Sequence, residues 1–463
     1  MKYSISILFL TFLNLSMAQN AKEKVLDLDA FITQIKLYHP LAKQANLQVD
    51  KAKAELLGAK GAFDPTVSVD ASRKTFDGKN YYFYTNPEIK IPLPVGDIKT
   101  GIENNGGQFL NSEFSSGQTS YFGFELPLAK GLLLDKRRAA LQQAKIYRNQ
   151  SEQERLRMLN DLLFDAYVSY GNWAGAYQLY NVFNNYVKIS TDRIRLIRLA
   201  NASGDRSVMD TLEAFTQLQN FQLLQADALV KLTTAALEIN TFLWLDSDSS
   251  YLLPNNTIPD AFQLNNTIAA TTLEEFISKG LTQNPTINEY NFKIDALEVE
   301  RKLKQQSLLP TLNAKANLLN KDYWAFNGLS GNFLQNNYKW GVDFKIPIFL
   351  REARGDVQKA KIKISETNLQ LNQKKWEVEN KVRNYFNEYV QLQNQVNIAN
   401  VTFNNYNSLY RSELLRFNNG ESSLFLVNSR ENKALEMLQK TIELRIKLYK
   451  SRYAIDWSAG QLR

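Results

Sequence analysis

The chain has 463 residues, enough for two or three ordinary domains, and a formal net charge of +8. It contains no cysteine, which excludes disulfides and cysteine metal sites. A single histidine, His39, excludes a histidine-based catalytic or metal cluster within one chain. Basic and acidic residues are interspersed rather than gathered in blocks, so we expect no nucleic-acid partner.

The first 18 residues have the pattern of a secretory signal peptide. A basic start, Met1-Lys2, precedes an apolar stretch, and Ser16-Met17-Ala18 forms a small-x-small cleavage site. A buried N-terminal helix is the alternative interpretation. No later window of about 18 apolar residues occurs. We therefore expect an exported chain that is either soluble outside the cytoplasm or spans a membrane as strands.

The chain contains one stretch twice. Residues 273–316 align with residues 28–71 without a gap, and both prolines of the first stretch, Pro40 and Pro65, meet prolines in the second. Further matches follow in the same order: Phe124-x-x-Pro127 with Phe344-x-x-Pro347, and Gly204-Asp205-x-Ser207 with Gly420-Glu421-x-Ser423. Such a pattern predicts an internal two-fold repeat of a unit of roughly 210 residues.

Each copy begins with two helices, which in the first copy are expected at 28–37 and from Pro40 to about residue 62. Apolar and polar residues then alternate, which predicts one strand pair per copy, at about 66–127 and 311–347. The segments 77–117 and 321–336 are polar and rich in glycine and aromatic residues, and we expect loops there. The prediction is thus four strands per chain.

Strict alternation gives a strand one apolar and one polar face. A soluble sandwich sheet is one interpretation, but exported strands of about ten residues with aromatic residues at their ends are typical of outer-membrane barrels. Four strands cannot close a barrel, and open edges cannot lie in lipid, so several chains would have to share the sheet. The residues expected to face lipid are Tyr338, Trp340, Val342, Phe344 and Ile346.

Long segments without proline follow each strand pair and predict helices at about 135–200 and 354–418. About 65 residues in one helix would extend nearly 100 Å, which suggests coiled-coil packing. Each helix meets a turn, at Gly204 or Gly420, and returns. The expected organisation is a signal peptide at 1–18, a first repeat at 19–245 with a helical hairpin at 135–245, a linking equatorial segment at 246–270, and a second repeat at 271–463 with a hairpin at 354–455.

The ordered landmarks resemble the TolC-like outer-membrane efflux proteins over essentially the whole mature length. The matching residues are Asn284-Pro285 at a helix start, Pro310-x-Leu312 entering a strand, Phe344-x-x-Pro347 leaving the sheet, Arg354 and Ala360 in the long helix, and Phe417-x-x-Gly420 at the turn. The first copy departs from the pattern with His39-Pro40 and the long 77–117 segment. The resemblance implies an α+β membrane protein: a trimeric 12-stranded β-barrel, four strands per chain, continued by a long α-helical coiled-coil barrel.

The resemblance also implies a function. It points to a passive exit duct of a tripartite efflux or type I secretion system, located in the outer membrane with its helical tube in the periplasm. The partners would be two further copies of the chain, outer-membrane lipid, a periplasmic adaptor and an inner-membrane pump. An exported coiled-coil adaptor or scaffold without a membrane barrel is the alternative. No nucleophile–base pair, phosphate loop or carboxylate pair stands out, so we expect neither an enzyme nor a cofactor.

Two sets of site residues follow from the charged and glycine-containing tips of the helical hairpins. The turns at Gly204, Asp205, Gly420 and Glu421 are candidates for the periplasmic tip and for adaptor docking, or are simple helix caps. Family tubes are held shut by polar and ionic links near the tip. The candidate gate residues are Arg411, Glu413 and Arg416, for which a solvated helix face is the alternative.

Overall fold

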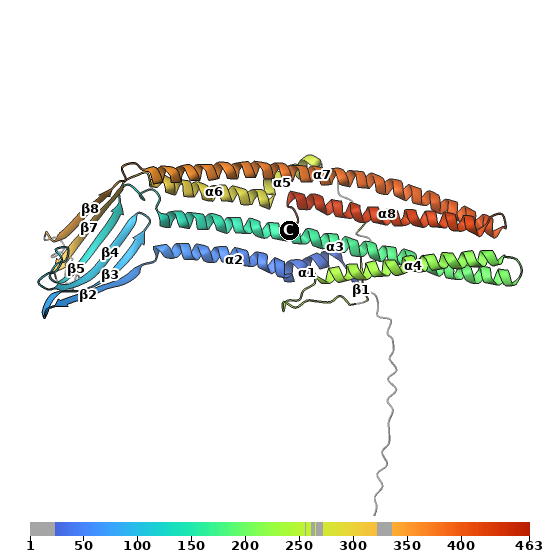
Figure 1. Cartoon of the computed structure of the whole chain (residues 1–463), viewed down its shortest axis with the longest axis horizontal. Helices are drawn as coiled ribbons and strands as arrows, with labels where there is room; N and C mark the ends of the chain where they lie inside the picture. The colour runs from blue at the N-terminus through green and yellow to red at the C-terminus, as the bar shows by residue number, and fades with distance from the viewer. Residues whose placement is uncertain (1–23, 255, 261–263, 265–271, 322–335) are drawn as a thin grey trace, which may run out of the picture. The chain divides into compact units, whose positions relative to one another are not determined.

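The computed structural model describes residues 24–254, 256–260, 264, 272–321 and 336–463 (Figure 1). The expected signal peptide and most of the expected 321–336 loop lie outside these residues. No described helix is both long and apolar enough to cross a membrane. The chain divides into two compact units, each assembled from separate segments: 1–39, 166–266 and 392–450 form the first, and 40–165, 267–391 and 451–463 form the second.

Paired helices precede the strands in both halves of the sequence. Helices α1 (Leu28–Tyr38) and α2 (Pro40–Lys60) correspond in order to α5 (Leu273–Gln283) and α6 (Pro285–Gln306). The start of α6 shows why the chain breaks there, because Asn284 caps the helix by accepting a hydrogen bond from the Thr286 amide and Pro285 occupies the first turn.

Long helices follow the strands. Helix α3 (Lys136–Ala202) returns through α4 (Val208–Asn240), and α7 (Arg351–Asn418) returns through α8 (Leu424–Ala459). They correspond to the long segments without proline in the sequence. A short parallel pair, β1 (Lys24–Leu26) with β6 (Thr257–Pro259), lies in the first unit.

The core of the first unit is aromatic. Tyr170 is fully buried, donates a hydrogen bond to the Leu26 carbonyl at 2.7 Å and packs its ring 5.7 Å from Phe31. The neighbouring Gly171 allows α8 to approach α3 closely, since a Cβ at this position would lie 2.6 Å from the Tyr449 ring. This close packing fixes the helices from which the hairpin tips extend.

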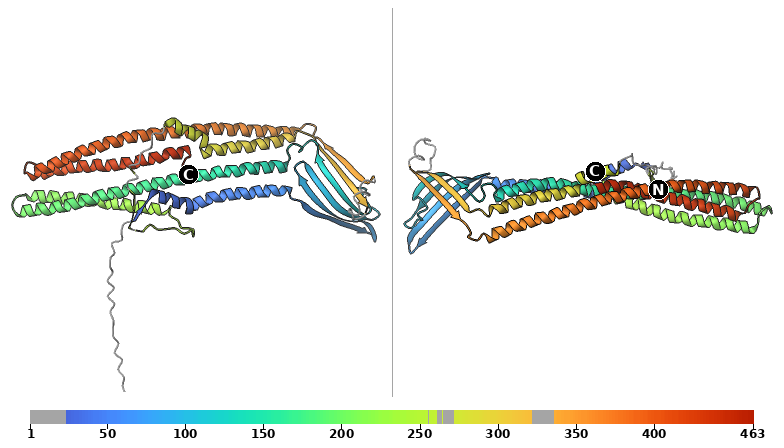
Figure 2. Two further views of the ribbon diagram at one scale, coloured as in Figure 1. Left: turned by 180° about the vertical axis from the view of Figure 1, so that it is seen from behind. Right: turned by 90° about the horizontal axis from the view of Figure 1, so that it is seen from above.

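The second unit contains a six-stranded antiparallel sheet (Figure 2). Its strands, in spatial order, are β2 (Thr66–Phe76), β3 (Lys79–Leu93), β4 (Gly96–Gly106), β5 (Gly117–Pro127), β7 (Thr311–Lys321) and β8 (Tyr338–Lys345). The prediction of four strands per chain was therefore wrong, and so was the expected loop at 77–117. That segment forms the hairpin β3–β4, which lies between β2 and β5.

The hairpin could not be predicted from the alternation, because its residues on the apolar face of the sheet are not uniformly apolar. Thr85, Thr100 and Asn104 share a face with Ile89 and Ile98, so the alternation is diluted. A local signal was nevertheless present. Asp77 and Gly78 have φ angles of 52° and 69°, as a two-residue type I′ hairpin turn requires, and Asp-Gly is a preferred pair for this turn.

Cross-strand register gives the sheet two distinct faces. The apolar face continues over all six strands and includes Val67, Val69, Ile89, Ile98, Phe122, Phe124, Leu318, Trp340, Val342 and Phe344. The opposite face carries a row of ion pairs across β3, β4, β5, β7 and β8: Lys90–Asp97, Lys99–Glu125, Lys315–Glu125 and Lys315–Asp343. The sheet therefore has one apolar face and one face lined by ion pairs.

Candidate functional site

The tips of both helical hairpins are built in the same way. Gly204 and Gly420 have φ angles of 84° and 80°, which glycine adopts at little steric cost. The amides of Asp205 and Glu421 donate back to the carbonyls of Ala200 and Arg416. These are Schellman-type helix ends, so both predicted tip turns are helix C-caps in geometry. After the first turn, a capping box between Ser207 and Asp210 starts α4.

One arginine joins the two tips within the first unit. The Arg206 guanidinium lies 4.0 Å from the centre of the Phe417 ring and donates to the Phe417 carbonyl at 3.1 Å. Phe417 is buried in a cluster with Ile194, Leu218, Leu424 and Val427. The first tip turn is thus held against the last turn of α7 by a cation–π contact and a hydrogen bond.

The predicted gate residues do not form a single cluster. Glu413 is buried and accepts a hydrogen bond from the Ser422 hydroxyl. Arg416 is exposed and its guanidinium lies 3.9 Å from Glu413 and 4.0 Å from Glu421, at the limit of an ion pair. Arg411 is exposed, and no ion pair connects it to any other described residue. The structure therefore brings together Glu413, Arg416 and Glu421 but not Arg411.

A stronger ionic link lies further from the turns. Arg193 on α3 donates from its two terminal nitrogens to the two carboxylate oxygens of Glu431 on α8, each at 2.6 Å. The same guanidinium donates to the Tyr410 hydroxyl on α7 at 3.0 Å and contacts Asn428 at 3.4 Å. Glu431 is only 1% exposed. This network joins three helices that are distant in sequence.

The electrostatics of this network follow from burial and pairing. Burial alone would lower the pKa of Arg193, but the hydrogen bonds and charge of Glu431 outweigh it and raise that pKa. Burial raises the pKa of Tyr410 well above its ordinary value, and the nearby Glu431 charge acts in the same direction. The tyrosine thus stays a neutral acceptor for Arg193. Arg193 belongs to the charged tip region visible in the sequence, but no local pattern indicates Glu431 or Tyr410.

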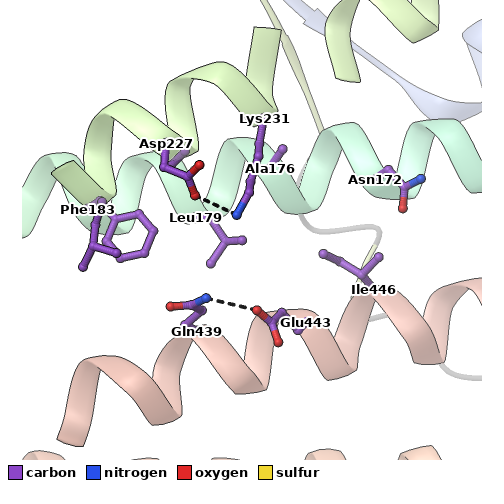
Figure 3. Close-up of a pocket in the computed structure, with 11 residues that line it drawn as sticks. Asn172, Ala176, Leu179, Phe183, Asp227, Lys231, Gln439, Glu443 and Ile446 are labelled. Atoms are coloured by element: carbon purple, nitrogen blue, oxygen red, sulfur yellow. Dashed lines mark hydrogen bonds and ion pairs between the residues drawn. The ribbon is translucent and has the colours of Figure 1, made fainter. Parts of the chain in front are cut away.

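A cavity of about 220 Å³ lies among α3, α4 and α8 in the first unit (Figure 3). Its apolar lining includes Leu179, Phe183 and Ile446. Its charged and amide groups are paired one helical turn away: Lys231 with Asp227 at 2.8 Å and Gln439 with Glu443 at 3.1 Å. Since these groups bond within their own helices, they do not converge on a ligand as a binding site requires.

Among the described residues, no group of three or more His, Cys, Asp or Glu side chains is placed so that it could hold a metal ion. His39 lies at the break between α1 and α2 and packs against the rings of Phe242 and Trp244. Burial lowers its pKa, although a hydrogen bond with the Thr241 backbone opposes this shift. His39 is therefore a neutral packing residue.

The predicted lipid-facing residues lie on β8, which is an edge strand of the sheet, or directly after its end. Tyr338, Trp340, Val342 and Phe344 lie on the apolar face of β8, and Ile346 follows directly after its end. All five are exposed in the single chain. They belong to one continuous apolar surface.

Comparison with known proteins agrees with this architecture. Residues 276–461 match the outer membrane efflux protein family. None of the curated proteins matches the chain. Among solved structures, the chain is similar to the CmeC outer membrane channel of Campylobacter jejuni, with 14% identity, a TM-score of 0.64, and coverage of 94% of this chain and 85% of that one.

Two further solved structures share the fold. The open-state MtrE outer membrane channel of Neisseria gonorrhoeae is 12% identical, with a TM-score of 0.64 and coverage of 94% and 89%. The outer membrane protein VceC of Vibrio cholerae is 12% identical, with a TM-score of 0.63 and coverage of 93% and 95%. At these identities the likeness establishes the fold, and the family match covers residues 276–461. Residues 276–461 thus match the outer membrane efflux protein family and the chain shares the fold of the CmeC and MtrE channels, which agrees with the TolC-like resemblance of its sequence.

Proposed function

We propose that the chain is one protomer of a homotrimeric exit duct in the outer membrane. The duct receives its cargo through a periplasmic adaptor from an inner-membrane pump and conducts it passively to the exterior. The observation that carries this proposal is the sheet in the second unit, which is apolar on one face and lined by ion pairs on the other.

The apolar face supports a membrane location. Val67 is 75% exposed at one edge of the sheet, and Trp340 is 70% exposed at the other. A surface of this kind is unfavourable in water but suits lipid, and an apolar outer face with a polar inner face is the pattern of outer-membrane strands. The alternative function, a soluble exported scaffold, would leave this face without cover. We therefore assign Tyr338, Trp340, Val342, Phe344 and Ile346 to the lipid interface.

Two stripes in the first unit support self-association. Along α4, exposed uncharged residues recur at alternating spacings of three and four: Leu212, Thr216, Gln219, Leu223, Ala226, Val230, Thr233 and Leu237. The exposed stripe on α7 has the same spacing: Asn394, Ile398, Val401, Asn405, Ser408, Ser412 and Leu415. Such spacing is that of a coiled-coil seam.

The two stripes suit each other as partners. Each stripe has one end near a tip turn, and the two run in opposite chain directions, because α4 leaves Gly204 whereas α7 approaches Gly420. Each lacks charged residues and lies exposed on its own chain. Packing α4 of one copy antiparallel against α7 of the next would bury both stripes, and repeating this contact around an axis would close a ring.

The hairpin tips remain the proposed docking and gating region. Gly204, Asp205, Gly420 and Glu421 would face the adaptor, and Glu413 with Arg416 would contribute to closure. Arg411 would contribute only across a contact with another copy. The matching order of elements in the two halves supports an ancestral duplication, which places two similar tips on each protomer.

The first test of this proposal is the location of the natural protein. When membranes are separated by density, the protein should be found in the outer-membrane fraction. Extraction of that fraction with high salt should leave the protein in the membrane, and only detergent should release it. Recovery of a soluble periplasmic monomer would overturn the proposal.

A further inference from the structure

The β3–β4 hairpin changes what three copies of this chain would build. We infer that the hairpin is part of the membrane wall and that three protomers, joined edge to edge between β8 of one and β2 of the next, close a barrel of 18 strands. This inference rests on the proposed function, because it assumes the trimeric duct. It replaces the 12 strands that four strands per chain would supply.

The hairpin is bonded into the sheet on both sides. Strand β3 pairs with β2 from Thr66↔Lys90 to Phe76↔Lys79, and β4 pairs with β5 from Asp97↔Glu125 to Asn105↔Gly117. Strands β2 and β5 do not pair with each other. Removing the hairpin from the wall would therefore break two full ladders of backbone hydrogen bonds, whose groups lipid cannot satisfy.

A side-chain hydrogen bond on the polar face of the sheet also joins the hairpin to β5. The Tyr121 hydroxyl on β5 donates to Glu88 on β3 at 2.6 Å, so its side chain crosses the intervening strand β4. It does so over Gly101, where a Cβ would lie 2.8 Å from the tyrosine ring. A glycine under an aromatic ring from the next strand is a device that fixes register in curved sheets.

The hairpin also extends to the end of the sheet next to the helices. Asp97, just after the β3–β4 turn, pairs with Lys90 at 2.9 Å and with Arg137 in the first turn of α3 at 2.8 Å. Strand β3 has 15 residues and β4 has 11. A transmembrane strand needs about 9–11 residues. Both strands are thus long enough to cross the membrane beside β2 and β5.

The two open edges fit a second copy of the chain. Every neighbouring pair in the sheet is antiparallel, and an even number of strands makes β8 run opposite to β2. A rotated copy can therefore continue the same antiparallel ladder. Neither β2 nor β8 contains a proline to block such pairing, and the apolar face extends to both edges.

Three six-stranded sheets joined in this way make 18 strands. Barrel diameter grows roughly linearly with strand number, so the barrel would be about one and a half times the diameter of a 12-stranded barrel, with a wider lumen. The added wall would contribute Lys90, Asp97 and Lys99 to the charged lining of each protomer. The hairpin thereby widens the exit for cargo.

The direct test is single-particle imaging of the full-length mature protein in lipid nanodiscs, with the strands of the membrane wall counted. The inference predicts 18 strands with β3 and β4 in continuous pairing. Trimers with 12 strands and a displaced hairpin would overturn it while leaving the proposed duct intact. Absence of a trimeric membrane particle would instead overturn the proposed function.

A second test uses the absence of native cysteine. Ile98→Cys and Lys99→Cys lie next to each other on β4, on the apolar and polar faces respectively. In reconstituted trimers, a membrane-impermeant maleimide should label Lys99→Cys at least about tenfold faster than Ile98→Cys, because lipid covers the latter. Equal labelling would show that the hairpin lies outside the wall and would overturn the inference.

Discussion

Arg193 and Glu431 form a buried, two-pronged ion pair between α3 and α8, with both nitrogen–oxygen distances at 2.6 Å. The Tyr410 hydroxyl completes the site from α7. The pair joins helices that belong to the two different hairpins of the chain. Removing one partner of a buried ion pair is strongly destabilising, because the charge of the other partner then stays buried without an opposite charge.

Glu431→Leu should therefore destabilise the helical unit by about 3–5 kcal/mol, because it leaves Arg193 buried without its partner. The measurement is thermal unfolding of the detergent-extracted protein followed by circular dichroism. The double variant Arg193→Met with Glu431→Leu is the matched control and should recover most of the lost stability. An unchanged unfolding temperature in the single variant would show that the pair contributes nothing.

Glu413 and Arg411 offer a test of tip closure. Glu413→Arg removes the buried acceptor of the Ser422 hydroxyl and places a second cation near Arg416, so the turn should loosen. We expect a several-fold higher basal conductance in planar bilayers. A loss of about 1.4 kcal/mol in the free energy of tip closure would change the ratio of closed to open tips about tenfold. Arg411→Glu reverses an exposed charge on the same helix. If the two reversals act equally, the buried contact of Glu413 has no special role.

Val342 and Gly341 are adjacent on β8 and lie on opposite faces of the sheet. Val342→Arg should impair assembly, because an arginine facing lipid near the midplane costs about 2–4 kcal/mol. Gly341→Arg places the same side chain on the polar face, where a Cβ meets open space. The readout is the amount of heat-modifiable oligomer in the outer membrane. A soluble sheet would tolerate both substitutions, and that result would favour the scaffold function.

The uncharged stripe on α4 gives a test of self-association away from the sheet. Leu223 is 70% exposed on the single chain, and Leu223→Glu would bury a charge in the proposed contact with α7 of the next copy. Burying this charge should cost roughly 1–3 kcal/mol per interface, and the equilibrium should shift from trimer towards monomer. Light scattering measures this shift. Gln222→Glu adds the same charge beside the stripe and should leave the trimer intact. If both variants had the same proportion of trimer, the stripe on α4 would not be part of the interface between copies.

Much of the helical architecture could be predicted from local signals. Pro40 and Pro285 mark helix starts because proline lacks a donor that the first turn does not need. Gly204 and Gly420 mark the turns because their φ angles are positive. The strands around Trp340 were visible because apolar and polar residues alternate there without interruption.

Two features could not be read from these patterns. Strands β3 and β4 carry threonine and asparagine on the apolar face of the sheet, and neighbours in the sheet, rather than residues along the strand, complete the apolar surface. Arg193 and Glu431 are separated by 238 residues, so only the packing of α3 on α8 brings them together. The local periodicity of a sequence indicates which face of a helix or strand is buried. It does not indicate which distant residue contacts that face.

The mass and symmetry of the detergent-extracted particle are the measurements that bear most closely on a trimeric membrane duct. Single-particle imaging combined with mass photometry should find three copies of the chain around a three-fold axis, with the sheets enclosing a lumen. A monomer whose sheet remains open in detergent would contradict a trimeric duct, because the exposed edges of β2 and β8 and the stripes on α4 and α7 would then have no partner.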